Sequence, residues 1–254
     1  MTAQPAAGAA RARWRALVLP ALLTVAMAAV LVGLGIWQLQ RLAWKEELIR
    51  TVAERTVAPP VPLPPPKDWA ALRPEDYEYR RVAATGRFDH AREARVFRPL
   101  TEARGPFHGI GDLVVTPFHL AGGGTVMVNR GFVPEARRDP ATRGAGQVAG
   151  ETTITGLMRA PQGRNAFTPA DDPDRNQWFT VDPAAMAARD GIAETAPFVI
   201  DEDAGQAPGG LPQGGETVLD FPNSHFSYAL TWFGLALGLL AVFTAFAWRQ
   251  IRGA

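Results

Sequence analysis

A histidine stands near the start of a long uncharged apolar run, "FPNSHFSYALTWFGLALGLLAVFTAFAW", residues 221–248. If this run is helical, His225 shares one helix face with three later residues, at spacings of three, four and seven: Tyr228, Ala229 and Trp232. A neutral imidazole beside two aromatic side chains and a small alanine is chemically suited to bind haem iron. The alternative is an interfacial histidine that hydrogen-bonds to lipid headgroups or to Asn223, and the residue types leave both interpretations open.

The remaining histidines and the composition exclude several other kinds of chemistry. Three further histidines lie far apart, show no metal-binding spacing, and are interpreted as surface or turn residues: His90, His108 and His119. The chain has no cysteine, which excludes thiolate metal sites, iron–sulfur clusters and c-type haem attachment. A formal charge of +1 provides no basic field for nucleic acid, and no catalytic acid–base pair is visible. We therefore expect neither a nucleic-acid-binding protein nor an enzyme.

Arg130 is a further candidate for binding a partner. In the sequence "VNRGF" it is expected to end a strand, just before Gly131. The alternative is an arginine at the rim of a barrel that donates hydrogen bonds to loop carbonyls. The sequence leaves a structural role and a partner-binding role open.

Two apolar runs are long enough to cross a membrane as helices, which takes about 20 residues. We place the first transmembrane helix at residues 16–38 and the second at residues 223–248. Trp37 lies where an interfacial aromatic residue is expected, and Pro20 falls in the first turn, where its missing N–H costs little. A cleaved signal peptide is the alternative for the first run, but the run continues well past the small residues 26–28, which favours an uncleaved anchor.

The charges beside these runs predict their orientation. The terminal segments 1–15 and 249–254 contain arginines and no acidic residue, so the positive-inside rule places both tails in the cytoplasm. Residues 39–222 then lie on the periplasmic side of a bacterial inner membrane, and the short first tail favours this over a mitochondrial membrane. Membrane lipid is therefore an expected partner. Small residues four apart also predict close helix packing, Ala29 with Gly33 and Gly234 with Gly238.

The segment between the two runs predicts a β-rich domain. Residues 41–56 continue the first helix outward, and the proline-rich residues 58–66 form a semi-rigid spacer. Short strand-like runs bounded by turn residues follow at 77–89, 94–100, 111–120, 125–134, 152–161, 176–181 and 197–202. Residues 121–124, "AGGG", join two of them as a hairpin. One helix is expected after Asp182 as N-cap, with Pro183 first and Gly191 as its stop.

These elements predict the fold class. Short strands at this spacing with one helix indicate an antiparallel, barrel-like α+β domain. The whole chain is then a membrane protein with two transmembrane helices that flank this extracytoplasmic domain. No internal repeat is present.

Three motifs in this order resemble the surfeit-locus-one (Shy1-like) family of cytochrome c oxidase assembly factors. They are "WQLQR" at residues 37–41, "NRGFVP" at 129–134 and "NSHFSYALTWF" at 223–233, and the resemblance runs nearly end to end. Asn129 and Phe132 stand where many members have Asp and Trp, which is a mild variation. The resemblance implies two membrane helices that hold a domain on the periplasmic or intermembrane-space side, in a protein that assists assembly of a haem-copper oxidase of the cytochrome c type aa3.

The resemblance also implies a cofactor, a ligand and partners. It implies transient binding of haem a, with His225 as the iron ligand, and insertion of the haem into the oxidase catalytic subunit. A haem a synthesis enzyme is a further expected partner. Antiparallel spans would bring Trp37, Gln38 and Arg41 to the depth of His225, with the ring against Trp37 and Trp232 and the propionates at Arg41.

Two other functions are compatible with the resemblance. One is a chaperone that stabilises the haem-free catalytic subunit without binding haem. The other is an enzyme that modifies haem, which would need redox or metal-binding residues that the sequence does not offer.

Overall fold

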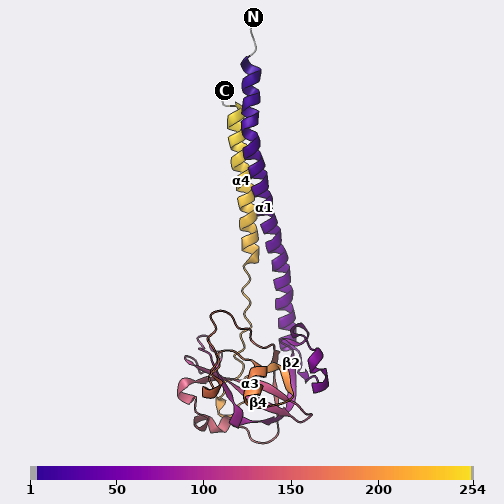
Figure 1. Cartoon of the computed structure of the whole chain (residues 1–254), viewed down its shortest axis with the longest axis vertical. Helices are drawn as coiled ribbons and strands as arrows, with labels where there is room; N and C mark the ends of the chain where they lie inside the picture. The colour runs from indigo at the N-terminus through magenta and orange to yellow at the C-terminus, as the bar shows by residue number, and fades with distance from the viewer. Residues whose placement is uncertain (1–4, 253–254) are drawn as a thin grey trace. The chain divides into compact units, whose positions relative to one another are not determined.

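The computed structural model describes residues 5–252, with side chains from Trp14 onward. Residues 1–4 and 253–254, which belong to the tails predicted to be cytoplasmic, lie outside this range. The chain divides into two compact units, with residues 52–219 in one and the segments on either side of them in the other. Two long helices, α1 and α4, form most of the helical unit, and the other unit contains the strands (Figure 1).

Helix α1 runs from Pro5 to Val57, a length of 53 residues. The prediction that Pro20 lies in the first turn is wrong, because Pro20 lies inside the helix. The preceding sequence is rich in alanine and arginine, which are good helix formers, so the helix begins earlier than the apolar run. Its outward continuation through residues 41–56 is confirmed, and it ends where two prolines follow, since proline opposes the helical hydrogen bonds.

Helix α4 runs from His225 to Arg252 and carries arginines in its last turn. Both α1 and α4 are apolar enough to cross a membrane, with mean hydropathies of 2.6 and 2.0 in their most apolar parts. Length and composition therefore give two candidate membrane spans, which indicates a membrane protein.

The second unit contains a seven-stranded sheet that closes on itself. Its strands are β1 (Val61–Pro62), β2 (Arg81–Phe88), β3 (Ala94–Phe97), β4 (Gly111–Leu120), β5 (Thr125–Pro134), β6 (Thr152–Arg159) and β7 (Thr195–Glu202). They lie in the order β1-β2-β6-β7-β5-β4-β3, and β2 also pairs with β4, which closes a ring of five strands. Gly86 allows this closure, because a Cβ there would lie 2.2 Å from the backbone oxygen of His119. The barrel-like prediction is confirmed.

The prediction of a fully antiparallel sheet is wrong at two strand pairs. Strand β7 pairs with β5 in parallel, and β1 pairs with β2 in parallel, whereas the other pairs are antiparallel. Parallel neighbours require a crossover connection, and the chain between β5 and β7 includes both β6 and helix α3 (Pro183–Arg189). The hairpin predicted around residues 121–124 is confirmed by the antiparallel pairing of β4 with β5.

Two segments differ from the strands that the sequence predicts. Residues 176–181 do not form a strand. Asn176 adopts a left-handed conformation, and the segment contributes two isolated bridges, from Gln177 to Asp172 and from Trp178 to Val96. Conversely, the proline-rich spacer contains β1 at the sheet edge, where a missing N–H is tolerated. The spacer also packs on the barrel, since Leu63 contacts its core and Trp69 Nε1 donates to the Pro64 oxygen at 2.8 Å.

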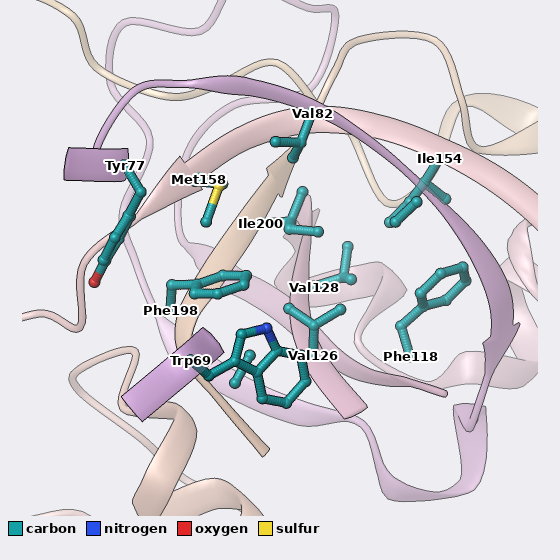
Figure 2. Close-up of a cluster of buried hydrophobic side chains, with 12 residues drawn as sticks. Trp69, Tyr77, Val82, Phe118, Val126, Val128, Ile154, Met158, Phe198 and Ile200 are labelled. Carbon is teal, nitrogen blue, oxygen red and sulfur yellow. The ribbon is translucent and has the colours of Figure 1, made fainter. Parts of the chain in front are cut away.

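The barrel interior is filled by side chains from all five ring strands. In Figure 2 these side chains point toward one another, with Trp69 and Tyr77 beside them. The interior residues are Val82, Ala84, Phe118, Val126, Val128, Ile154, Met158, Ala196, Phe198 and Ile200. Alternate residues on one strand, such as Val126 and Val128, point inward, as the two-residue period of a strand requires. Each Å² of apolar surface that these side chains remove from water stabilises the fold by roughly 25 cal/mol.

Helix α3 covers part of the outer face of the sheet. A second apolar cluster there joins Met127 and Val199 to Trp178 and to Met186 of α3. The predicted N-cap of α3 is confirmed, because Asp182 Oδ1 accepts hydrogen bonds from the amides of Ala184 and Ala185 at 3.0 and 3.1 Å. The remaining helical segments are short: Pro66–Ala71, Pro74–Tyr77, His90–Arg92, Glu135–Arg137, Pro140–Gly146, Pro173–Arg175 and Pro208–Gly210.

Candidate functional site

Helices α1 and α4 lie side by side (Figure 1) and pack through two matching stripes. On α4 the least exposed positions recur at spacings of four and three residues: His225, Ala229, Trp232 and Ala236. On α1 the same alternation of spacings joins Thr24, Ala28, Leu31, Gly35 and Gln38. Such a repeat is the seam of a paired helix, so each stripe faces the partner helix.

Small residues let the two helices approach, but they are not the ones that the sequence indicated. Ala229 and Ala236 are only 1% and 4% exposed, and a Cβ at Gly35 would lie 2.6 Å from the Phe233 ring. By contrast, a Cβ at Gly33, Gly234 or Gly238 would meet nothing within 4 Å. The predicted packing of these glycines is therefore wrong, because the helices meet along a seam at other positions.

The only strongly polar contact on this seam joins His225 to Gln38 among the residues that the structure describes. His225 Nδ1 and Gln38 Oε1 are 2.7 Å apart, and Gln38 is 8% exposed whereas His225 is partly buried. The Gln38 oxygen can only accept, so this contact is a hydrogen bond when the proton of a neutral ring lies on Nδ1. The backbone N–H of His225 also lies 3.5 Å from Asn223 Oδ1.

The other predicted haem-site residues are distributed over this helix pair. Trp232 is partly buried on the same stripe as His225, as the sequence predicted. Tyr228 is 55% exposed and Trp37 is 53% exposed, so both lie off the seam. Arg41 is exposed, and its guanidinium lies 3.9 Å from the centre of the Trp44 ring. The structure therefore joins His225 to Gln38 and places Trp232 further along the same stripe, and it leaves the other side chains on the outer surface.

Arg130 occupies a different position from the one predicted. It lies inside β5 rather than at its end, at a β-bulge where Gly131 and Asn129 pair with the successive residues Val114 and Val115. Its side chain is 1% exposed, and its Nη2 donates to the Gly146 oxygen at 2.8 Å. The guanidinium also lies 4.5 Å from the centre of the Phe88 ring. This burial supports the structural alternative, since no guanidinium surface is available to a partner.

Arg130 belongs to a buried group of charges that no feature of the sequence indicated. Its Nε lies 3.6 Å from Glu202 Oε2, beyond hydrogen-bond distance, so this attraction is ionic. A second buried pair joins Arg143 Nη2 to Glu93 Oε1. Burial raises the pKa of the Glu202 carboxyl to about 7, against the opposing effect of Arg130. Burial also lowers the pKa of the Arg130 guanidinium.

The three barrel histidines do not form a metal site. His90 Nε2 lies 2.9 Å from the Val148 oxygen, and His119 Nδ1 lies 3.0 Å from Thr125 Oγ1. His108 is exposed. Within residues 5–252 no three histidine or carboxylate side chains are grouped as metal ligands. Of the four histidines, His225 is the one that lies on the seam between the two apolar helices.

Comparisons with known proteins match the part of the chain that contains both Gln38 on α1 and His225 on α4. A sequence model described as the SURF1 family matches residues 25–237, which include Gln38 and His225. Surfeit locus protein 1 of Mus musculus is 41% identical over 229 residues, which cover 86% of this chain and 71% of the mouse protein. A SURF1-like protein of Monosiga brevicollis is 41% identical over 219 residues, 83% of this chain and 80% of its own. Human Surfeit locus protein 1 is 38% identical over 234 residues, 87% and 74% of the two chains.

Proposed function

This chain belongs to the SURF1 family, and from that premise we propose that it is an assembly factor for a haem-copper oxidase of the cytochrome c type aa3. In this proposal the protein binds haem a transiently and promotes its insertion into the oxidase catalytic subunit. Haem a is cargo rather than a resident cofactor, and the proposal assigns the chain no catalytic reaction.

The observation that carries the proposal is the state of His225 on the helix seam. Its Nδ1 atom is engaged by Gln38, and its Nε2 atom makes no hydrogen bond to any residue of the described chain. A neutral imidazole with one free lone pair is the form that ligates haem iron. The surrounding stripe is apolar apart from Gln38 and Thr24, which suits a hydrophobic macrocycle. The residues present therefore fit haem a.

Four further residues would contribute to holding the cargo. Trp232 shares the seam with His225, and the exposed rings of Trp37 and Tyr228 offer apolar surface for a macrocycle. Arg41 would pair with the anionic propionates, and its exposed guanidinium is supported by the Trp44 ring.

The proposed location follows from the charges at the helix ends. Arg249 and Arg252 lie in the last turn of α4, and no acidic residue accompanies them. The positive-inside rule then favours two membrane spans with cytoplasmic tails and a barrel in the periplasm of a bacterial inner membrane. A periplasmic reporter fused after Asp203 is expected to be active, and the same reporter fused after Ala254 is expected to be silent. The opposite pattern would overturn this location.

The function is tested by the haem spectrum of the full-length protein. The protein is co-expressed with a haem a synthesis enzyme and purified in detergent, as wild type and as His225→Ala and His108→Ala variants. We expect His225→Ala to abolish or strongly shift the Soret band, because it removes the iron ligand. His108→Ala removes an exposed barrel histidine and should leave the band unchanged.

Two outcomes would contradict the proposal in different ways. A wild-type spectrum from His225→Ala would show that the ligand lies elsewhere, and His90 and His119 would be examined next. A wild-type protein that supports oxidase assembly but never carries haem a would establish the haem-free chaperone instead.

A further inference from the structure

The contact between His225 and Gln38 determines more than the position of the imidazole ring. A neutral imidazole carries one N–H and one lone pair, so fixing the proton on one nitrogen exposes the lone pair on the other. Isolated histidine favours the proton on Nε2, which would leave that atom unable to bind iron. The 2.7 Å contact with Gln38 Oε1 favours the opposite tautomer, because only an Nδ1–H can donate to an acceptor there.

The amide is held in place by the packing of the helices. Gln38 is 8% exposed and lies on the seam of α1, three residues after Gly35, which contacts the Phe233 ring. A buried amide loses little further freedom when it accepts a hydrogen bond, so its oxygen is preorganised for the imidazole. Gln40, two residues later on the same helix, is exposed and makes no such contact within the described chain.

The chemical nature of residue 38 also matters. A carboxylate would accept the same proton more strongly, but it would carry a charge into an apolar helix pair at considerable cost. An amide oxygen provides the acceptor without that charge. It also leaves the imidazole a neutral ligand of moderate basicity, since the basicity of a ligating histidine rises with the strength of the acceptor on its other nitrogen.

We propose that Gln38 is a positioning residue for haem ligation, which fixes His225 as the Nδ1–H tautomer and presents the Nε2 lone pair to the iron of haem a. This inference rests on the proposed function, since the ligand is the same. Gln38 does not contact the iron in this scheme and acts only through His225.

The first test needs no haem. The full-length protein is labelled with ¹⁵N-histidine, purified haem-free in detergent, and the His225 resonances are identified by their loss in His225→Ala. We expect an Nδ1–H tautomer in the wild type and in Gln40→Leu. In Gln38→Leu the spectrum should shift toward the Nε2–H tautomer, because the acceptor is gone. An unchanged tautomer in Gln38→Leu would overturn the inference.

The second test compares variants loaded with haem a. Gln38→Leu should weaken haem retention by about tenfold or more, the range seen when the partner of a ligating histidine is removed. Gln38→Glu keeps the shape and strengthens the acceptor, so it should lower the haem reduction potential, whereas Gln38→Leu should raise it. Gln40→Leu is the matched control and should behave as wild type. Equal potentials and retention in all of these proteins would overturn the inference.

The two proposals fail in distinguishable ways. If the wild-type protein takes up no haem a, the proposed function fails, and the ¹⁵N spectrum alone decides whether Gln38 sets the tautomer. If the wild type binds haem a through His225 but Gln38→Leu and Gln38→Glu match it, only the positioning role fails. If Gln38→Leu does not accumulate, Gln38→Glu still supplies the change in potential.

Discussion

The helix pair and the β-barrel both bury polar groups, but they do so in opposite ways. On the helix seam a single hydrogen bond joins the buried Gln38 to the partly exposed His225. In the barrel the charged side chains of Arg130 and Glu202 are only 1% and 3% exposed. A second charged pair, Arg143 with Glu93, is enclosed in the same way.

The difference indicates what each group of residues is for. A residue that must bind and release a cargo has to be reachable, and His225 is. A fully enclosed ion pair cannot contact a partner, and its net contribution to stability depends on how well each charge is compensated. The contrast agrees with the proposed function, in which the helix pair binds the ligand and the barrel charges help to fix the local fold.

The largest effect is expected from removing Arg130. At pH 8, Arg130→Met removes the cation that favours the ionised Glu202 carboxyl, so this buried group must either stay charged without a partner or take up a proton, and the Gly146 carbonyl loses its donor. Breaking a buried pair in this way costs about 3–5 kcal/mol. The measurement is denaturant unfolding of the full-length protein in detergent, followed by near-UV circular dichroism.

A double variant separates structure from recognition at this position. Adding Glu202→Leu to Arg130→Met removes the orphaned charge and should recover most of the lost stability. If stability returns and oxidase assembly returns with it, Arg130 acts through the fold. If Arg130→Met is stable but assembly is lost, the partner-binding prediction for Arg130 is correct and our contrast between the two regions is wrong.

The sequence predicted local features better than long-range ones. Asp182 followed by Pro183 predicted the start of α3, and the "AGGG" segment predicted the β4–β5 turn, because capping and turn chemistry depend on neighbouring residues. The parallel pairing of β5 with β7 and the ion pair of Arg130 with Glu202 were not predictable, since they join residues about 70 positions apart. For the candidate site, the position of His225 in an uncharged run was enough to single it out from the sequence. The contact of Gln38 with His225 could not be predicted, because it depends on the register between the two helices.

The second prediction concerns pH and the barrel alone. The pKa of Glu202 is about 7 in the folded protein, against an ordinary value of 4.5, so the folded state binds this proton more tightly than the unfolded state. The resulting stabilisation is complete below pH 4.5 and is lost as the pH rises through 7. It amounts to about 3 kcal/mol. Between pH 4.5 and 8 the unfolding free energy of wild type should therefore fall by about this amount more than that of Glu202→Gln.

His90 provides the internal check on this measurement. Burial lowers the pKa of His90 below its ordinary value of 6.5, so its effect has the opposite sign and stability is lost as the pH falls. The effect of His90 is common to wild type and Glu202→Gln and cancels in their difference. Parallel pH profiles for these two proteins would show that Glu202 titrates normally, and the barrel charges would then not be the enclosed group that we describe.

The smallest predicted effect distinguishes two glycines on α1. Gly35 lies on the seam, where a Cβ would come within 2.6 Å of the Phe233 ring, whereas a Cβ at Gly33 would meet nothing within 4 Å. The sequence favoured Gly33 because it lies four residues after Ala29, but the seam passes through Ala28 and Gly35 instead. Spacing alone does not reveal which face of a helix meets its neighbour.

The absence of cysteine in the chain allows this difference to be measured directly. In a background with Gln38→Cys and His225→Cys, a short bis-maleimide should link the two helices, because the native side chains at these positions are in contact. Gly35→Val should slow the linking about tenfold, since overpacking a helix contact costs about 1–3 kcal/mol. Gly33→Val should link at the rate of the parent. Equal rates for the two valine variants would show that the helices do not meet along this seam, and the assignment of ligand chemistry to a preorganised helix pair would fail with it.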